Sequence, residues 1–158
     1  MREILFRGKR QENDVYGKVG EWVYGIPIQN KIGTFISFDK NPHYCYQDYY
    51  IELDEISKID PKTVGQYTGL TDKNGKRIFE GDILKCCDDK IGFEFMAIAE
   101  FGNPNGTYSW GWQLKPISGD TFVNPDILLW LEMEETGAYA EIIGNIHDNP
   151  ELIGGVEE

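Results

Sequence analysis

The stretch VGQYTGLTDKNGKRIFEGDILK, residues 64–85, constrains the fold of this chain more than any other segment. Short apolar runs alternate there with Gly, Asn and Asp, which accept the backbone geometry of tight turns. The pair Asn74-Gly75, placed between apolar runs, is a strong signal for a β-hairpin. Gly81 permits a second bend, after which the Asp82 carboxylate can accept backbone amides. The pattern therefore predicts a tightly turned β-sheet rather than a ligand-binding loop.

Strand-like runs, rich in β-branched and aromatic residues and bounded by Gly, Asn, Asp or Pro, occur along the rest of the chain. They cover residues 4–7, 22–28, 34–38, 49–53, 83–87, 93–101, 107–114 and 140–146. The segment GNPNGT at 102–107 predicts a hairpin between two of these runs. In the run 22–28, large residues occupy every second position, which predicts one inward-facing side of a strand. The residues on that side are Trp22, Tyr24, Ile26 and Ile28.

Two sites favour the start of a helix, Asn124-Pro125-Asp126 and Asn149-Pro150-Glu151, because Asn can cap a helix and Pro suits its first position. They predict a short helix over residues 125–135 and a further turn or two after residue 149. The sequence as a whole predicts a mainly β fold. We expect a small barrel-like, SH3-like antiparallel sheet with an N-terminal β lobe and one or two short helices. The SH3 comparison is an analogy drawn from the Glu-Gly-Asp strand entry.

A change of pattern near residues 59–61 marks the best internal boundary. The aromatic-rich segment HYCYQDYY at 43–50 lies before this point, and the tightly punctuated stretch lies after it. We expect an N-terminal β lobe over residues 1–59, a barrel-like β lobe over 60–150 and an acidic tail over 151–158, all within one structural unit.

The composition predicts a folded, cytoplasmic protein. The 158 residues are 41% hydrophobic, and no apolar run reaches the ~20 residues of a membrane span. The opening MREILFRGKR lacks the long apolar centre of a secretory signal. The three cysteines, Cys45, Cys86 and Cys87, are odd in number and two are adjacent, which favours reduced thiols in a reducing compartment. We expect no membrane association.

The net charge of −12 at pH 7 is concentrated toward the C-terminal end. No Lys or Arg follows Lys115, whereas ten Asp or Glu residues do. Such a field repels phosphate backbones, so we expect no direct nucleic-acid binding. It favours a basic protein partner instead, and one hypothesis is that the acidic C-terminal third imitates the charge pattern of a nucleic acid.

Candidate catalytic and metal-binding residues form no complete motif. The series Asp72, Asn74, Lys76 departs from a calcium loop at Lys76, where an oxygen ligand is needed. The thiols and histidines lack zinc-ligand spacing, and no nucleophile motif or phosphate-binding Gly-rich loop occurs, so we expect no cofactor. Carboxylates are the remaining candidates. Asp72, Glu80 and Asp82 suit a small metal-dependent hydrolase, although in so acidic a chain such residues more often form a solvated face.

Two groups of aromatic residues are candidate contact surfaces. Tyr108, Trp110 and Trp112 alternate along one strand face, and we expect them to pack in the core. The other use of such a face, stacking of single-stranded nucleic acid, needs a basic groove that this segment lacks. The tyrosines of segment 43–50 are a stronger candidate for partner contact, and a lid over a second small core explains them equally well. These tyrosines are Tyr44, Tyr46, Tyr49 and Tyr50.

Three blocks together resemble one protein family: REILFRGKR at 2–10, IDPKTVGQYTGLTDKNGKRIFEGDILK at 59–85 and EIIGNIHDNPEL at 141–152. They resemble the YopX family of bacteriophage and prophage proteins and occur in that family's order. The segments 11–58 and 86–140 carry little of the pattern. We interpret the signature positions as structural turns; they are Gly65, Gln66, Tyr67, Thr68, Gly69, Asp72, Asn74, Gly75, Gly81, Asp82, Gly144 and Asn145.

The resemblance implies a small phage-encoded protein in the cytoplasm of a bacterial host cell, with self-association as one expectation. The family supplies no catalytic residues to carry over. The leading hypothesis is therefore a non-enzymatic module that binds an unknown protein partner or forms a homo-oligomer. The alternative is the small metal-dependent carboxylate hydrolase.

Overall fold

The structure, a computed structural model, describes residues 3–40, 43–45, 50–106, 110–119, 125–131 and 137–154, with the backbone alone described at 43–45 and 50–52. The chain divides into two compact units, Met1–Gln66 and Tyr67–Glu158. The division falls inside a single strand, β7 (Gly65–Thr71). The first two residues of β7 pair within the first unit, and its later residues pair within the second.

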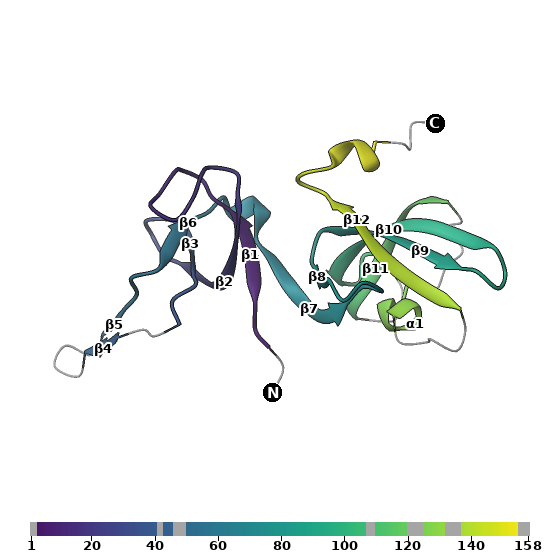
Figure 1. The fold of residues 1–158 in the computed structure, drawn as a ribbon, viewed down its shortest axis with the longest axis horizontal. Helices are drawn as coiled ribbons and strands as arrows, with labels where there is room; N and C mark the ends of the chain where they lie inside the picture. The colour runs from purple at the N-terminus through teal and green to yellow at the C-terminus, as the bar shows by residue number, and fades with distance from the viewer. Residues whose placement is uncertain are drawn as a thin grey trace. The chain divides into compact units, whose positions relative to one another are not determined.

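The first unit is an antiparallel sheet in the order β6-β3-β2-β1, to which the start of β7 adds (Figure 1). A separate two-stranded ladder joins β4 to β5, and the 3-10 helix η1 precedes β7. The bounds of these elements are β1 Phe6–Lys9, β2 Trp22–Gln29, β3 Thr34–Ser37, β4 His43–Cys45, β5 Tyr50–Glu52, β6 Ile56–Lys58 and η1 Pro61–Thr63.

Strand β2 alternates between a buried and an exposed face, as its pattern predicts, but the prediction of which face is inward is wrong. Val23 and Gly25 are buried. Tyr24 and Ile26, on the face predicted to be inward, are 47% and 50% exposed. The smaller residues of the strand therefore face the core, and two of the larger ones face outward.

The reason is a close approach that only glycine allows. The small core of this unit is formed by Val23, Ile36 and Ile59. A Cβ at Gly8 would lie 2.5 Å from the Ile59 Cδ1 atom, and a Cβ at Gly25 would lie 2.9 Å from the Ile36 Cγ2 atom. These distances are below van der Waals contact, so the two isoleucines fill the space that the missing side chains leave.

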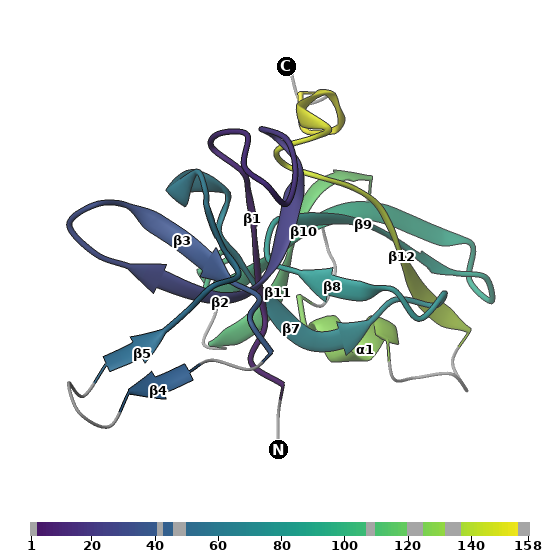
Figure 2. The ribbon, with the colours of Figure 1, turned by 60° about the vertical axis from the view of Figure 1, so that its left-hand side comes forward.

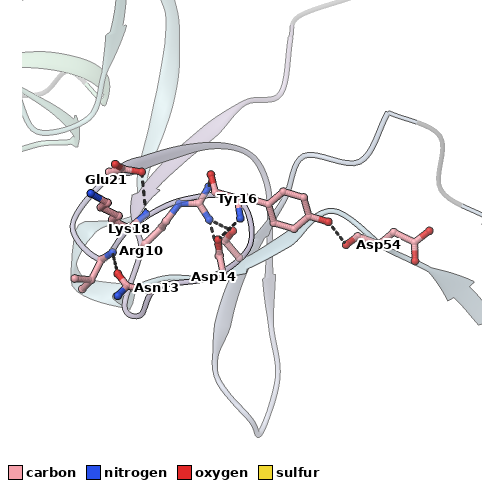
Figure 3. A network of polar contacts seen from close by, with 9 residues as sticks. Arg10, Asn13, Asp14, Tyr16, Lys18, Glu21 and Asp54 are labelled. Carbon is pink, nitrogen blue, oxygen red and sulfur yellow. Dashed lines mark hydrogen bonds and ion pairs between the residues drawn. The ribbon is translucent and has the colours of Figure 1, made fainter.

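Arg10 holds the loop between β1 and β2 (Figure 3). Its buried guanidinium donates from Nη1 to the Asp14 Oδ2 atom at 2.5 Å and to the Ser57 hydroxyl oxygen. The Tyr16 backbone N–H donates to the other Asp14 oxygen at 2.8 Å. Burial by itself would raise the pKa of Asp14, but hydrogen bonds from Ser57 and the Tyr16 amide, together with the Arg10 charge, lower that pKa below its ordinary value.

The second unit contains a four-stranded antiparallel sheet in the order β11-β10-β9-β12 and the β7–β8 hairpin. Figure 2 shows the long paired strands β9 and β10 with the turn that joins them. The bounds of the elements are β8 Arg77–Phe79, β9 Asp82–Asp88, β10 Phe93–Gly102, β11 Gly111–Gly119, α1 Ile127–Leu131, β12 Ala138–Asn145 and the 3-10 helix η3 Pro150–Leu152.

One face of this sheet packs against α1 to form the larger core. The Trp130 ring of α1 meets Phe95 of β10 edge-on, with ring centroids 4.9 Å apart, and Trp130 is only 6% exposed. The fully or almost fully buried members of this core are Ile78, Leu84, Cys86, Phe95, Ala97, Ala99, Leu114, Ile127, Trp130 and Ala140. Burial of this apolar area is the main stabilising contribution of the unit.

The prediction of a mainly β fold is confirmed. Strands β11 and β12 are the outer strands of their sheet, and within the described ranges no pairing closes it into a barrel. The predicted hairpin joins β10 to β11, with Gly102 opposite Gly111. A short helix forms after residue 125 and a 3-10 turn after Asn149. No described helix is long and apolar enough to cross a membrane.

Candidate functional site

The turn at residues 72–76 is organised by the Asp72 side chain. Its Oδ1 atom accepts hydrogen bonds from the backbone N–H groups of Asn74 and Lys76, each at 2.9 Å. Gly75 has a φ of 78°, the left-handed conformation that glycine adopts at little cost. Asp72 is almost completely buried, so its carboxylate acts as an internal acceptor of the turn.

The same turn is attached to the outer edge of β12. The second Asp72 oxygen, Oδ2, accepts from the Ile142 N–H at 3.1 Å, and the Lys73 N–H donates to the Ala140 carbonyl oxygen at 3.0 Å. An ion pair of 2.6 Å between Lys73 and Glu141 lies at the surface of this contact. The turn thereby covers edge groups that would otherwise be open for pairing with another chain.

The Glu-Gly-Asp segment makes a second junction. Gly81 has a φ of 81°; its N–H donates to the Ala99 carbonyl oxygen and its own carbonyl oxygen accepts from the Ile146 N–H, both at 2.9 Å. Asp82 is buried, and its Oδ2 atom accepts from the Phe79 N–H at 2.8 Å. This segment therefore ties the β8 hairpin to the ends of β10 and β12.

The closing block forms its own turn. Asn145 Oδ1 accepts from the backbone N–H groups of His147 and Asp148, both at 3.0 Å, and its Nδ2 group donates to the Asp148 carboxylate at 2.8 Å. A Cβ at Gly144 would lie 2.5 Å from the Asn149 Oδ1 atom, so only glycine fits beside this side chain. The closing block packs against the central stretch through Ile146 and Gly81.

The first motif residues lie in β7. Gly65 and Gln66 stand opposite Arg7 and Phe6 in the ladder with β1. The Tyr67 ring lies 5.5 Å from the Phe79 ring, measured between centroids. The buried Thr68 hydroxyl donates to the Ile78 carbonyl oxygen at 2.9 Å, and Gly69 has a φ of 90°. Gly65 and Gln66 thus pair with β1, whereas Tyr67 and Thr68 contact β8.

A cavity of about 450 Å³ lies between β11, β7 and the start of α1. This size is within the range of small-ligand and anchor pockets. Most of its lining is apolar, and three of the lining side chains, Thr68, Gln113 and Asp126, are polar. The lining residues are Thr68, Leu70, Trp110, Gly111, Trp112, Gln113, Pro125, Asp126, Ile127 and Leu128.

Trp110 lies at this cavity and is 77% exposed. The prediction that Trp110 packs in the core is therefore wrong. Its neighbour Trp112 is partly buried, lying edge-on to Phe101 with centroids 5.1 Å apart. The two tryptophans of one strand pattern thus have different environments: Trp110 precedes β11, whereas Trp112 lies within it. Tyr108, the third residue of the pattern, lies outside the described residues.

Comparison with protein families gives a match to the YopX protein family over residues 5–154. The chain belongs to the YopX family. The YopX match includes the three blocks that carry the resemblance, apart from the first residues of the opening block. Among curated proteins, none matches this YopX chain significantly.

A solved structure has a fold similar to that of this chain: the crystal structure of protein EF1440 from Enterococcus faecalis. The alignment has a TM-score of 0.52 and 24% sequence identity, and it covers 97% of this chain and 99% of that chain. At this identity, the likeness concerns the fold.

The geometry gives the motif carboxylates of this YopX protein a structural use. Asp72 and Asp82 each direct carboxylate oxygens at backbone N–H groups. Glu80 precedes Gly81 in the turn between β8 and β9. Within the described parts of the chain, no cluster of three or more His, Cys, Asp or Glu side chains is arranged to hold a metal ion.

The tyrosines of segment 43–50, predicted to contact a partner, fall where the structure describes the backbone alone or no residue. The backbone places Tyr44 in β4 and Tyr50 in β5, and Tyr46 and Tyr49 lie outside the described residues. The cavity beside Trp110 was not among the sequence candidates. Its sequence signal was the alternating aromatic pattern, which does not by itself distinguish a core face from an exposed one.

Proposed function

We propose that this YopX-family chain is a non-enzymatic protein-binding module of a phage or prophage, and that the cavity beside Trp110 is its docking site. The observation that carries the proposal is the 77% exposure of Trp110 at an apolar cavity. Tryptophan is among the residues most enriched at the energetic centres of protein interfaces. An exposed indole next to a preformed cavity provides an anchor together with space for a partner's side chain.

Other large apolar residues are exposed, but in different settings. Val15, Ile32 and Ile91 are each more than 70% exposed, and none of them lines the cavity. Single exposed apolar residues are normal on protein surfaces. Leu128, in contrast, is 42% exposed and lines the same cavity as Trp110. The pair of exposed apolar side chains at one cavity supports a contact site.

The charge of the second unit supports a basic partner. Residues 67–158 contain 17 Asp and Glu and 6 Lys and Arg, a net charge of −11, whereas residues 1–66 contain 10 and 9, a net charge of −1. Opposite charge on a partner would speed association and make binding sensitive to salt. A cytoplasmic host protein with a basic surface is the partner that this distribution favours.

Affinity capture from a bacterial host lysate tests the proposal, with Trp110→Ala and Ile91→Ala as matched variants. We expect a protein that the wild type and Ile91→Ala retain, that Trp110→Ala loses, and that added salt releases. Retention by Trp110→Ala equal to the wild type would overturn the docking site. Turnover in a broad hydrolase screen that is lost in Asp82→Asn, with the fold intact, would favour the hydrolase alternative instead.

Self-association through the same site is tested separately. Light scattering over a range of protein concentrations measures the mass of the wild type and of Trp110→Ala. A dimer that only the wild type forms would identify the partner as a second copy of the chain. A monomeric wild type at all concentrations would exclude a second copy of the chain as the partner.

A further inference from the structure

We propose that the outward face of the first unit's sheet is an interface between copies of this chain, and that it binds the acidic closing segment, residues 148–158, of a second copy. This face lies in the first unit, whereas the cavity beside Trp110 lies in the second, so the inference stands apart from the proposed function. Its basis is a match of charge and apolar character between two surfaces that the same chain carries.

The register of the sheet shows which side chains share the outward face. Residues that pair directly across two strands point to the same side of a sheet, and so does every second residue along one strand. Tyr24 of β2 pairs with Arg7 of β1, and Ile26 of β2 pairs with Ser37 of β3. Ser37 in turn pairs with Ile56 of β6. These five residues therefore lie on the side of the sheet that faces away from its small core.

Apolar side chains are exposed on this outward face. Tyr24, Ile26 and Ile56 are 47%, 50% and 36% exposed. Ser37 stands between the two isoleucines in the ladder and is small, so it covers neither of them. Single exposed apolar residues are ordinary, whereas several gathered on one face of a sheet form a patch of the kind that marks contact sites.

Basic side chains border the apolar patch. The Arg7 guanidinium carbon and the Lys9 Nζ atom lie 4.5 Å and 5.4 Å from the centroid of the Trp22 ring. Lys58 pairs with Phe35, and among the described residues its ammonium group has no ion-pair partner. Strands β1, β2, β3 and β6 contain these three basic residues and no Asp or Glu. The strands of this face are therefore positively charged in a chain of net charge −12.

The closing segment has the opposite charge. No Lys or Arg follows Lys115, so residues 148–158 carry carboxylates alone. The acidic residues of the segment are Asp148, Glu151, Glu157 and Glu158, and its large apolar residues are Leu152, Ile153 and Val156. Asp148 and Glu151 are exposed and Leu152 and Ile153 are partly buried, whereas residues 155–158 lie outside the described part of the chain. The segment thus combines carboxylates with apolar side chains, which complements the face.

The charges favour contact between two different surfaces of two copies. Two identical faces brought together would place Lys9 and Lys58 against the same cations, which repels. The face of one copy against the closing segment of another brings opposite charges together. Such a contact joins copies head to tail, or closes a symmetric dimer when it is made twice. Because surface charges contribute to the contact, added salt should weaken the association.

Charge reversal tests the contact in the full-length protein. Light scattering over a range of concentrations gives the average mass of each variant and, from its rise, an apparent association constant. We expect this constant to fall about tenfold or more in the face variant, Lys9→Glu with Lys58→Glu, and in the segment variant, Glu157→Lys with Glu158→Lys. The variant with all four changes should recover association, because both charges of each pair are reversed. A wild type that stays monomeric at every concentration, or a four-change variant without recovery, overturns the inference.

The control for the face variant is Lys18→Glu with Lys76→Glu, which has the same net charge. Both lysines are exposed. Lys18 lies in the loop between β1 and β2 and Lys76 lies in the turn before β8, so neither belongs to the face. We expect the control to associate like the wild type, with circular dichroism and thermal unfolding confirming that each variant is folded. A loss in the control equal to that in the face variant would show that net charge governs association, and would contradict the inference.

The apolar part of the contact has a test that leaves every charge in place. Ile26→Thr keeps a β-branched side chain, which suits a strand, but removes apolar surface from the patch. We expect association to weaken about tenfold, as for loss of a buried apolar contact. Val15→Thr is the matched control, since Val15 is 91% exposed in the loop between β1 and β2. Equal association of Ile26→Thr and the wild type contradicts the apolar contact.

Other uses of the face give different results. A single-stranded oligonucleotide that binds the monomeric protein but not the face variant would assign the face to nucleic acid and overturn the inference. Self-association that Trp110→Ala loses and the face variant keeps would place the interface at the cavity and likewise contradict it. Loss in the face variant with retention in Trp110→Ala supports the inference, whether or not the cavity captures a host protein. The failure of one proposal is therefore distinguishable from the failure of the other.

Discussion

The Asp72 carboxylate accepts a hydrogen bond from the Ile142 backbone N–H at 3.1 Å, between residues 70 positions apart in the sequence. Its other oxygen accepts the Asn74 and Lys76 amides of its own turn. One buried side chain thus joins a local turn to the outer edge of a sheet. The carboxylate of Asp72 and the backbone of Gly81 both make such long-range contacts within this unit.

Replacement of Asp72 by Ala should destabilise the protein by about 1–3 kcal/mol, because buried amides lose their acceptor. Asp72→Asn should keep the Asn74 and Lys76 bonds but direct an amide donor toward the Ile142 N–H, which gives a smaller loss. Asp88→Ala is the control, since the Asp88 carboxylate accepts the exposed Lys90 amide two residues further along its own turn. Urea unfolding measures all three. If Asp88→Ala loses as much unfolding free energy as Asp72→Ala, the bond from Asp72 to β12 does not contribute the expected stability.

Gly81→Ala should cost more stability than Gly75→Ala. Both residues have positive φ, so Ala loses about 1–2 kcal/mol at either position. At Gly75 the added Cβ meets open space, whereas at Gly81 it lies 3.2 Å from the Ile146 Cδ1 atom. Moving Ile146 away should add about 1 kcal/mol. Thermal unfolding of the two variants gives the difference directly, and equal losses would mean that Ile146 adjusts without cost.

Trp130→Ala and Trp110→Ala should differ sharply in stability. Trp130 is buried against Phe95, so its truncation should cost about 3–5 kcal/mol. Trp110 is exposed, so its truncation should stay within about 0.5 kcal/mol. Denaturant unfolding followed by circular dichroism measures both. A large loss in Trp110→Ala would show that this residue supports the fold and would weaken its use as a binding variant.

The Arg10–Asp14 pair should make stability depend on acid pH. The folded-state pKa of Asp14 lies below the ordinary value of an Asp carboxyl, so the stabilisation is complete above that ordinary value and is lost as pH falls through the lower folded-state pKa. The stability difference between wild type and Asp14→Asn should therefore be constant near neutral pH and shrink in acid. Unfolding titrations over the acid range test this. If the stability difference between the wild type and Asp14→Asn grows in acid, the folded-state pKa of Asp14 is raised and not lowered.

Cys86 should resist thiol reagents in the native protein. Burial raises its pKa to about 12, followed by a smaller contribution from Cys87. At about pH 8 only about one molecule in ten thousand would carry the reactive thiolate, even before access is considered. In a Cys45→Ser, Cys87→Ser background, labelling should follow denaturation and not precede it. Rapid native labelling would show that the β9 core opens readily.

The turn residues could be predicted from the sequence because turn geometry is local. Gly75 and Gly81 adopt left-handed conformations that few other residues accept, and Asn74 and Asp72 bond to amides only a few positions away. The short runs between them become strands for a similar reason, since β-branched and aromatic residues suit a pleated backbone. Mainly β structure follows from these preferences, whatever the strands later contact.

Only the tertiary structure decided which surfaces are inside. The alternation in β2 defines two faces, but Tyr24 faces outward because Ile36 and Ile59 pack onto the glycines of the opposite face. Trp110 and Trp112 follow one pattern, yet the hairpin leaves Trp110 exposed at a cavity that α1 completes. The Asp72–Ile142 bond likewise joins distant segments. Burial and long-range bonding depend on which segments meet in space, and local preferences do not contain that information.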